Sequence, residues 1–266
     1  MKTTVLLFVP GDRPERYAKA VASGADAAIV DLEDAVAPDR KPYARLEAQK
    51  AFAAGLDATL RINPPATEFG QADIAAFAGL HPRAVLVPNV ESVEDLQAVR
   101  IDAPLIALIE SVRGLRNIDE IAAFDRVIAL DFGAYDLCAE LGAQPTPEVL
   151  SPHRSMVILA ARLAHKLAHD APFLGIGDEA GLRAESERAV AYGFDGKLAI
   201  HPSQVATIRA AFTPSDAEVR HARAVLAAVE QGGVAVVGGK MVDPPLVASA
   251  RRVLARAEPA NAGVQL

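Results

Sequence analysis

The stretch from Ala103 to Gly142, APLIALIESVRGLRNIDEIAAFDRVIALDFGAYDLCAELG, decides how the rest of the chain folds. It contains two short, continuously apolar runs, Leu105–Ile109 and Val127–Leu130, separated by an amphipathic helical segment at 114–124. Apolar runs of this length that alternate with helices are typical of buried parallel strands. The stretch therefore predicts one strand–helix–strand unit of a parallel α/β fold.

A carboxylate follows each of these two runs. Glu110 comes directly after the first run, and Asp131 and Asp136 follow the second, on either side of Gly133. Because ligands bind where the loops after parallel strands converge, we expect these side chains to meet at one mouth of the sheet. Carboxylates delivered from two strands suit a hard divalent cation that keeps several waters, and Mg²⁺ is the usual choice.

Six further segments have the composition of strands. They are Thr4–Val9, Ala27–Leu32, Ala58–Ile62, Val85–Val87, Phe173–Ile176 and Lys197–Ile200. Helices are expected between them, the first with Asp12 as its N-cap and a long one over about 152–168. Strands and helices that alternate about eight times predict a closed TIM (β/α)₈ barrel, which needs roughly 250 residues. A doubly wound open sheet is the alternative, but no GxGxxG follows the first strand.

The chain beyond residue 212 is not needed to close such a barrel. We therefore divide the sequence into a catalytic barrel at 1–212 and a C-terminal helical extension at 213–266. Within the extension we expect helices at 214–230 and 244–257 and a short strand at 234–237. The last helix has an apolar stripe that must pack on something.

Composition limits the classes of partner. A net charge of -7 argues against nucleic acid or an anionic membrane, because either would need a basic surface. Hydrophobic residues make up 51% of the chain and Trp is absent, so the core should be aliphatic. The lone Cys138 excludes an internal disulfide, and the N-terminus has no basic segment before a long apolar span. We expect a soluble, cytoplasmic protein.

The polar residues at the predicted strand ends form an acidic group around one arginine. They are Asp31, Glu33, Asp34, Arg61, Asn89, Glu110, Asp131, Asp136 and His201. A single carboxylate at a barrel mouth can be an ion pair or a helix cap, and we favour such structural roles for Asp131 and His201. Several carboxylates facing one arginine repel one another unless a cation joins them, so the group as a whole indicates a binding site.

Four sets of motifs extend nearly from end to end. They are LFVPGDRPERYAKA with GADAAIVDLEDAVAPDRK, RINPP, ALIES with GAYDLCAELG, and GFDGKLAIHPSQV followed by GGKMVDPP. In these motifs the chain resembles the HpcH/HpaI aldolase and citrate lyase β-subunit family, in its CitE-like branch related to malyl-CoA and citramalyl-CoA lyases. The resemblance implies a TIM barrel with a swapped C-terminal segment, Mg²⁺ dependence, and carbon–carbon lyase chemistry on 3-hydroxyacyl-CoA substrates.

Carried over motif by motif, the resemblance assigns the metal to Glu110 in ALIES and Asp136 in GAYDL. Arg61 in RINPP would bind a substrate oxygen beside Glu110 and stabilise developing charge, a role that suits its fixed fork of donors. Asp31 and Glu33 would orient metal-bound water or Arg61. The alternative for these two carboxylates is that they only pair with Arg61.

The same resemblance points to a coenzyme A site near the first predicted helix. Phe8, Arg13 and Lys19 occupy positions used for coenzyme A in related acyl-CoA lyases. Phe8 offers an adenine-stacking or packing surface, and the two cations lie near a helix N-terminus, where phosphates commonly bind. For Arg13 and Lys19 the alternative is a solvated helix face. Many relatives carry a lysine at the position of Asn89, which leaves the acyl group of the substrate open.

Asp243, in GGKMVDPPLVASA, is the candidate from the extension. The glycine pair before it and Pro244 after it hold this residue just before the last helix, where it can simply be the N-cap. Relatives pack this segment over the mouth of an adjacent barrel in a homotrimer or a dimer of trimers. The resemblance therefore implies that Asp243 serves a neighbouring subunit as general acid/base for the thioester α-carbon.

Together these features predict a Mg²⁺-dependent lyase that cleaves or forms a bond between an acyl-CoA and a 2-keto acid. Malyl-CoA, citramalyl-CoA and β-methylmalyl-CoA are the expected substrates. One alternative is a citrate lyase β-subunit acting on an acyl carrier protein within a complex. Another is a barrel that has lost catalysis and only binds ligands, which the intact Glu110, Asp136 and Arg61 argue against.

Overall fold

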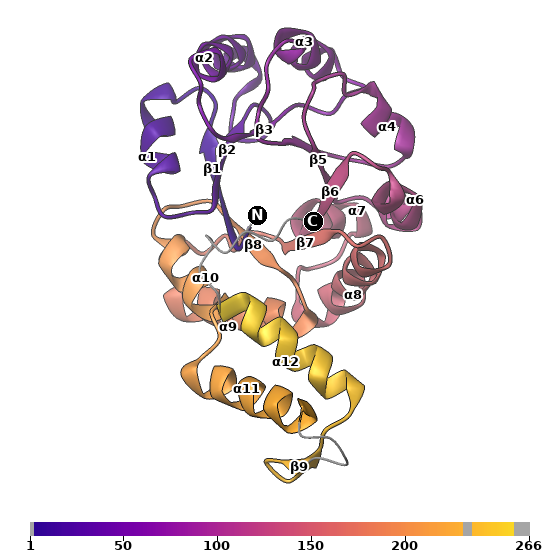
Figure 1. Cartoon of the computed structure of the whole chain (residues 1–266). Helices are drawn as coiled ribbons and strands as arrows, with labels where there is room; N and C mark the ends of the chain where they lie inside the picture. The colour runs from indigo at the N-terminus through magenta and orange to yellow at the C-terminus, as the bar shows by residue number, and fades with distance from the viewer. Residues whose placement is uncertain (1–2, 231–235, 258–266) are drawn as a thin grey trace. The chain divides into compact units, whose positions relative to one another are not determined.

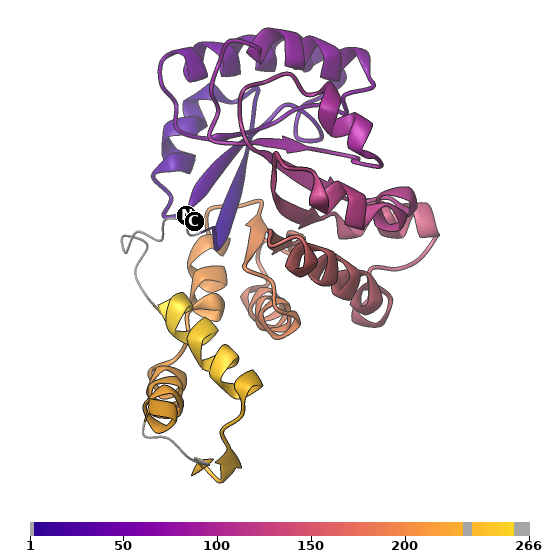
Figure 2. The same cartoon turned by 45° about the vertical axis from the view of Figure 1, so that its right-hand side comes forward.

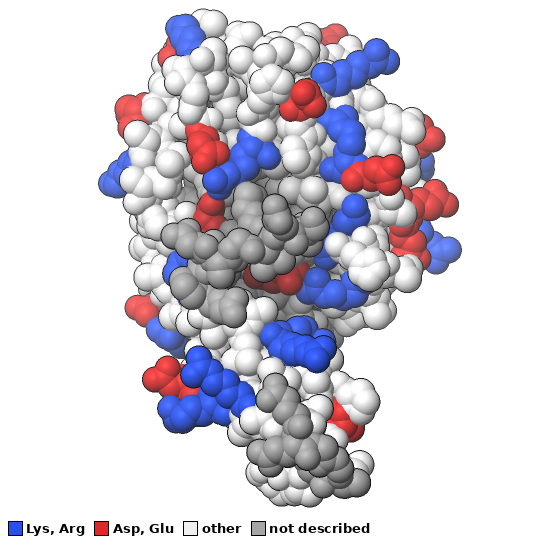
Figure 3. All heavy atoms as spheres, in the orientation of Figure 1, with Lys and Arg blue, Asp and Glu red and all other residues white. Residues whose placement is uncertain are grey.

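The computed structural model of the chain describes residues 3–230 and 236–257. They form two compact units, one at Thr3–Ile208 and one that starts at Arg209. No helix in the described ranges is long and apolar enough to cross a membrane. Lys and Arg side chains are interspersed with Asp and Glu on the face seen in Figure 3.

Parallel strands of the first unit close into a barrel, in which each strand pairs with the next and the last pairs with the first. Within the described residues the strands are β1 (Val5–Pro10), β2 (Ala27–Asp31), β3 (Thr59–Arg61), β4 (Val85–Val87), β5 (Leu105–Ile109), β6 (Val127–Phe132), β7 (Leu167–Asp170) and β8 (Gly196–Ala199). Figure 1 shows the strands around the centre and the helices outside them. The closed order confirms the TIM barrel and excludes the open sheet.

The helices of this unit lie outside the strands, as the turned view in Figure 2 also shows. They are the 3-10 turns η1 (Pro14–Arg16) and η2 (Pro38–Arg40), and α1 (Tyr17–Val21), α2 (Lys41–Ala53), α3 (Glu68–Phe77), α4 (Val93–Ala98), α5 (Val112–Arg116), α6 (Ile118–Ala123), α7 (Ala134–Leu141), α8 (Pro147–Leu163), α9 (Glu179–Tyr192) and α10 (Gln204–Phe212). Cys138 is buried on α7, and burial raises the pKa of its thiol, which fits the packing role expected of a lone cysteine.

The inside of the barrel is aliphatic, as the composition predicted. Leu6, Ile29, Leu86, Leu108 and Leu198 belong to one buried cluster contributed by β1, β2, β4, β5 and β8. Each fully buried side chain of this kind contributes about 1.5–3 kcal/mol to folding. This core supports the strand ends that carry the polar residues described below.

The seventh strand was predicted in the wrong place. We expected it at Phe173–Ile176, but β7 is Leu167–Asp170, and the preceding helix ends at Leu163 rather than near residue 168. The sequence of β7 hides the strand because two of its four residues are polar. Both are buried and paired: Nδ1 of His169 lies 2.6 Å from Oδ1 of Asp131, and Asp170 binds two cations.

Two helix predictions were also wrong in detail. The expected helix at 114–124 is two short helices, α5 and α6, which meet at Asn117. Asp12 does not cap the first helix, since the N-cap is Arg13 and no side chain makes a cap bond; the Asp12 carboxylate lies 3.7 Å from the Arg13 guanidinium and 3.6 Å from that of Arg40. The chain instead enters α1 through the 3-10 turn that begins at Pro14.

The second unit contains α11 (Asp216–Glu230), the short strands β9 (Val236–Val237) and β10 (Lys240–Met241), and α12 (Pro244–Ala257). Residues 234 and 235 of the predicted strand lie outside the described residues. The apolar stripe of α12 packs on α11, with Leu246 and Val253 against Ala222 and Val225. The stripe that we expected to need a partner therefore has one within its own unit.

A buried ion network joins β7 and β8 to the helices behind them. Asp170 is bound by the Arg154 Nε at 2.8 Å and the Lys197 Nζ at 2.7 Å, and both cations also contact Glu185. Burial alone would raise the pKa of Asp170, but the two cations outweigh it and hold the pKa below its ordinary value. The network therefore depends on all of its charges.

We predict that Asp170→Asn lowers the free energy of unfolding by about 3–5 kcal/mol, because it leaves two buried cations without their main anion. The matched control is Glu179→Gln, which removes an exposed pair with Arg183 on α9. That change should cost at most about 1 kcal/mol. Urea unfolding of both variants measures the difference, and equal losses would show that the buried network adds no special stability.

Candidate active site

A cavity of about 380 Å³ opens at the C-terminal ends of the barrel strands. One part of its lining is charged and consists of Asp31, Asp34, Arg61, Glu110 and Asp136. The rest is largely apolar, with Phe8, Leu108, Phe132, Leu174, Leu198 and Ile200 among its residues. The structure thus brings together most of the predicted site residues in one cavity with a polar and an apolar side.

Arg61, the last residue of β3, is bound in a fork by Asp31, the last residue of β2. Its Nε donates to Oδ1 at 2.7 Å and its NH2 to Oδ2 at 2.6 Å. The same carboxylate accepts the backbone N–H groups of Glu33 at 2.8 Å and Ala35 at 3.1 Å. Because a carboxylate has about four acceptor positions, Asp31 is saturated and is not free to bind a metal.

The third nitrogen of Arg61 faces two more carboxylates. Its NH1 lies 2.7 Å from Oε2 of Glu33 and 3.4 Å from Oδ2 of Asp34. The Glu33 contact is an ion pair without hydrogen-bond geometry, since Oε2 has no hydrogen-bond partner in the described structure. The ring of Phe8 lies 4.8 Å from the guanidinium. Asp34 is the one exposed carboxylate of this set, so a substrate oxygen would replace it at NH1 most easily.

The ionised form of Glu33 is disfavoured even though its carboxyl group contacts Arg61. Burial raises the pKa of Glu33 from 4.5 to about 8, and although Arg61 lowers it, the charges of Asp34 and Asp31 raise it further. A carboxyl group with a pKa this high can hold or release a proton near neutral pH.

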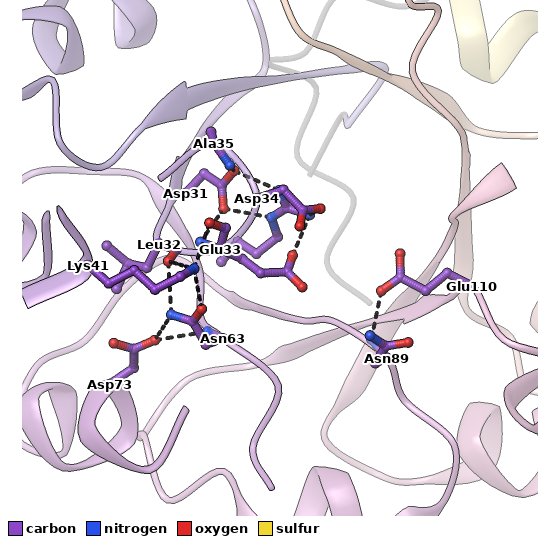
Figure 4. A network of polar contacts seen from close by, with 11 residues as sticks. Asp31, Leu32, Glu33, Asp34, Ala35, Lys41, Asn63, Asp73, Asn89 and Glu110 are labelled. Carbon is purple, nitrogen blue, oxygen red and sulfur yellow. Dashed lines mark hydrogen bonds and ion pairs between the residues drawn. The ribbon is translucent and has the colours of Figure 1, made fainter. Parts of the chain in front are cut away.

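Glu110 stands at the end of β5, opposite the Asp31–Asp34 loop in Figure 4. Its Oε1 accepts the backbone N–H of Asn89 at 2.8 Å. Asn89 has a φ of 49°, in the left-handed region that asparagine tolerates better than most residues. Burial raises the pKa of Glu110, the negative charge of Glu33 adds to this, and Asp136 adds a smaller contribution.

Gly133 leaves the space that Glu110 occupies. A Cβ at this position would lie 2.3 Å from Cβ and 2.6 Å from Oε2 of Glu110. Only glycine therefore allows β6 to turn into α7 at this distance from the carboxylate. This requirement was missed in the sequence, where Gly133 looked like an ordinary turn residue.

Glu110 and Asp136 fit a hard cation. Both line the cavity, and neither has an ion-pair partner within residues 3–230 and 236–257. The described part of the chain holds no group of three or more His, Cys, Asp or Glu side chains in a metal-binding arrangement. Two carboxylates, with water or substrate completing the shell, match the way proteins hold Mg²⁺.

The remaining predicted residues lie elsewhere. Arg13 and Lys19 are exposed on the segment after β1, outside the cavity lining. Asp243 belongs to the second unit, where its Oδ1 accepts the N–H of Leu246 at 2.9 Å as the N-cap of α12. Asp131 is buried inside the barrel against His169, and His201 is exposed beside Ser203, as expected of structural residues.

A cavity lined by carboxylates at the C-terminal mouth of a TIM barrel is the usual place of an enzyme active site. Residues 4–202 match the HpcH/HpaI aldolase/citrate lyase family. The chain belongs to this family, whose relatives act on CoA thioesters as lyases or thioesterases.

Individual relatives are similar over nearly their whole length. The chain is 40% identical to a (3S)-malyl-CoA thioesterase of Cereibacter sphaeroides, over 95% of this chain and 94% of the relative. It is 34% identical to an L-malyl-CoA/beta-methylmalyl-CoA lyase of the same species, over 95% and 93%. The crystal structure of CitE from Mycobacterium tuberculosis in complex with magnesium, acetoacetate and coenzyme A superposes with a TM-score of 0.86, at 37% identity, covering 96% of this chain and 98% of that one.

The raised pKa of Glu33 leads to a prediction for the metal-free protein. Between pH 4.5 and about 8 the folded state holds a proton on Glu33 that the unfolded state has lost. The stability that this proton contributes to the folded state is fully present at low pH and disappears as the pH rises through the folded pKa of Glu33. Glu33→Gln removes the titration, so its stability relative to the wild type should increase across this range. Urea unfolding at several pH values measures it, and a constant difference would contradict the raised pKa.

Proposed function

We propose that the protein is a Mg²⁺-dependent lyase that cleaves, or in reverse forms, the carbon–carbon bond of a 3-hydroxyacyl-CoA. The products of cleavage are an acyl-CoA and a 2-keto acid, and malyl-CoA, citramalyl-CoA and β-methylmalyl-CoA are the proposed substrates. The observation that carries the proposal is that Glu110 and Asp136 line one cavity with the Arg61 guanidinium. The lyase relative and the CitE complex with magnesium, acetoacetate and coenzyme A support it.

In this proposal Glu110 and Asp136 hold the metal. When bound there, Mg²⁺ would supply a Lewis acid that polarises the carbonyl oxygen of the keto acid. Burial raises the pKa of Glu110 and the charge of Glu33 adds to this, so its ionised carboxylate is disfavoured without a cation and would be stabilised by one.

Arg61 would stabilise the negative charge that develops on a substrate oxygen. In the cleavage direction the hydroxyl group loses its proton and becomes a carbonyl, and the bond to the thioester α-carbon breaks. The electron pair of that bond passes to the α-carbon as an enolate, which takes up a proton. No oxidant or reductant is needed. Asp31 would hold the Arg61 fork in place during these steps, because it is saturated and buried.

Arg13 and Lys19 remain proposed contacts for the phosphates of coenzyme A. Both are exposed cations on the segment after β1, and within residues 3–230 and 236–257 the one ion pair of either is the 3.7 Å contact of Arg13 with Asp12. Phe8, by contrast, packs against the Arg61 guanidinium at the cavity wall. Its proposed role is therefore to support Arg61 and the adjacent thioester rather than a distant adenine.

Hydrolysis of the thioester is the second candidate function. A relative named (3S)-malyl-CoA thioesterase is 40% identical to this chain, against 34% for a relative named L-malyl-CoA/beta-methylmalyl-CoA lyase. The described cavity lining contains no Ser, Thr, Cys or His, so an acyl-enzyme route has no nucleophile of these types. A thioesterase built on this site would instead direct water at the thioester carbon.

Product analysis separates the two candidates. Incubated with malyl-CoA and Mg²⁺, a lyase forms a 2-keto acid without a free thiol, whereas a thioesterase releases a free thiol without a keto acid. We expect keto-acid formation that requires Mg²⁺ and is lost in Glu110→Gln. The control Glu94→Gln changes an exposed carboxylate on α4 and should retain full activity. Thiol release alone would overturn the lyase and support the thioesterase.

We further propose that the extension at 213–266 completes the site of a neighbouring subunit in a trimer or hexamer, with Asp243 moving the proton of the α-carbon. Asp243 is exposed in its own unit, which leaves its carboxylate accessible to another chain. Asp243→Asn keeps the N-cap, because asparagine caps helices as well as aspartate does. The variant should therefore fold normally and lose turnover.

An experiment with mixed subunits tests whether Asp243 of one chain completes the site of another. Inactive Asp243→Asn combined with inactive Glu110→Gln should regain part of the activity after subunit exchange, because some cavities then receive both intact carboxylates. Exchange is verified independently by mass spectrometry of differently labelled chains. Full activity of Asp243→Asn alone, or a mixture that stays inactive after proven exchange, would exclude a shared site.

A further inference from the structure

Lys41, the first residue of α2, is buried beneath the loop that carries the acidic residues. Its side chain donates from Nζ to three oxygens: Leu32 O at 3.0 Å, Glu33 O at 2.7 Å and Asn63 Oδ1 at 2.6 Å. An ammonium group has three donors, so all are used. The ring of Phe69 lies 5.6 Å from Nζ. Lys41 does not line the cavity, and yet it binds the loop that does.

A second layer of contacts fixes the position of Lys41. Asn63 donates from Nδ2 to Leu32 O at 2.9 Å and to Asp73 Oδ2 at 2.7 Å. Asp73, fully buried on α3, also binds the backbone N–H of Asn63 and the Nε of Arg45. Figure 4 shows Lys41, Asn63 and Asp73 on the side of the loop away from Glu110. The ammonium group is therefore held from both α2 and α3.

The loop at 32–35 is hydrogen-bonded through both its backbone N–H groups and its carbonyls. Its N–H groups at Glu33 and Ala35 donate to the Asp31 carboxylate, and its carbonyls at Leu32 and Glu33 accept from Lys41. Since Asp31 also binds Arg61, one carboxylate holds both the loop and the guanidinium. Lys41 supplies charged donors to the carbonyls of Leu32 and Glu33. Without it, Leu32 O would keep only the Asn63 amide and Glu33 O only the N–H of Val36 at 3.1 Å, and both of these donors are neutral.

We propose that Lys41 is a positioning residue of the active site: it fixes the loop so that Glu33 and Asp31 together keep Arg61 aimed into the cavity. Lys41 also places a positive charge below a group of carboxylates that otherwise repel one another. The catalytic consequence rests on the proposed function, but the placement of Arg61 does not. This assigns to Lys41 a role at the site, beyond a contribution to stability alone.

A matched control exists at the opposite end of the barrel. Arg126, just before β6, donates to the carbonyls of Val99 at 2.7 Å, Ile101 at 2.5 Å and Ala103 at 2.9 Å. It is a cation that holds loop carbonyls, as Lys41 is, but it lies at the N-terminal ends of the strands. Lys41→Met and Arg126→Met should both destabilise the protein, so stability alone does not separate a positioning role from a structural one.

The decisive readout is hydrogen exchange of the Arg61 Nε–H group, followed by NMR of arginine side chains in the metal-free full chain. This N–H is bonded to Asp31 at 2.7 Å and sits in a residue that is 8% exposed. We expect Lys41→Met to accelerate its exchange on the order of tenfold or more, because the loop opens more often. Arg126→Met should leave the rate within about twofold of the wild type once stability is matched with urea.

If Lys41→Met does not fold, Lys41→Gln keeps neutral donors at the same place and should show the same change in smaller size. Turnover per folded molecule should fall with the exchange protection in the Lys41 variants and stay constant in Arg126→Met. Unchanged exchange at Arg61 in both Lys41 variants, or an equal change in Arg126→Met, would overturn the proposal. Because the exchange experiment needs no substrate, it is decided even if the proposed lyase activity is absent.

Discussion

The structure depends on an excess of negative charge held at the mouth of the barrel. Asp31, Glu33, Asp34, Glu110 and Asp136 gather there against the cations Arg61 and Lys41. Burial is the main cause of the raised pKa values of Glu33 and Glu110, and repulsion from neighbouring carboxylates, which is stronger out of water than at the surface, raises them further. The rest of the fold must therefore stabilise a site that opposes folding, as the aliphatic barrel interior does.

Some of these carboxylates have hydrogen-bond or ion-pair partners at both oxygens, and others have a partner at only one. Asp31 uses both oxygens on Arg61 and on backbone N–H groups, and Asp73 is likewise fully engaged. Glu110, in contrast, has one oxygen on the N–H of Asn89 and the other packed beside Gly133, with no ion-pair partner among the described residues. Binding capacity resides in the unsatisfied groups, whereas the satisfied groups determine where the cations point.

The sequence predicted the barrel and its charged mouth because their signals are local. Apolar runs mark buried strands, and the residue after each run is placed at the C-terminal end by that fact alone. β7 was missed because its polar residues, His169 and Asp170, are paired with partners far away in the sequence. A pattern of hydrophobicity cannot show a strand in which two of four residues are polar.

The contacts that hold the site residues in place could not be predicted from sequence patterns either. Lys41 looks like a solvated residue at a helix start, and only the fold shows that Leu32, Glu33 and Asn63 converge on its ammonium group. Gly133 is comparable, since its need for a missing Cβ arises from Glu110 on another strand. The residues proposed to touch substrate are thus easier to predict than the residues that hold them, because only the former stand at fixed places in the strand order.

Asp243 combines a local role as a helix cap with its proposed role in catalysis. One of its oxygens is fixed by the N–H of Leu246, while Pro244 follows directly and stiffens the backbone. A cap bond of this kind selects one side-chain rotamer, and the second oxygen then points in a defined direction without further cost in entropy. Packing of α12 on α11 stabilises the helix on which this carboxylate is mounted. An exposed carboxylate prepared in this way suits proton transfer to a bound partner, which requires a group that is rigid before the partner arrives.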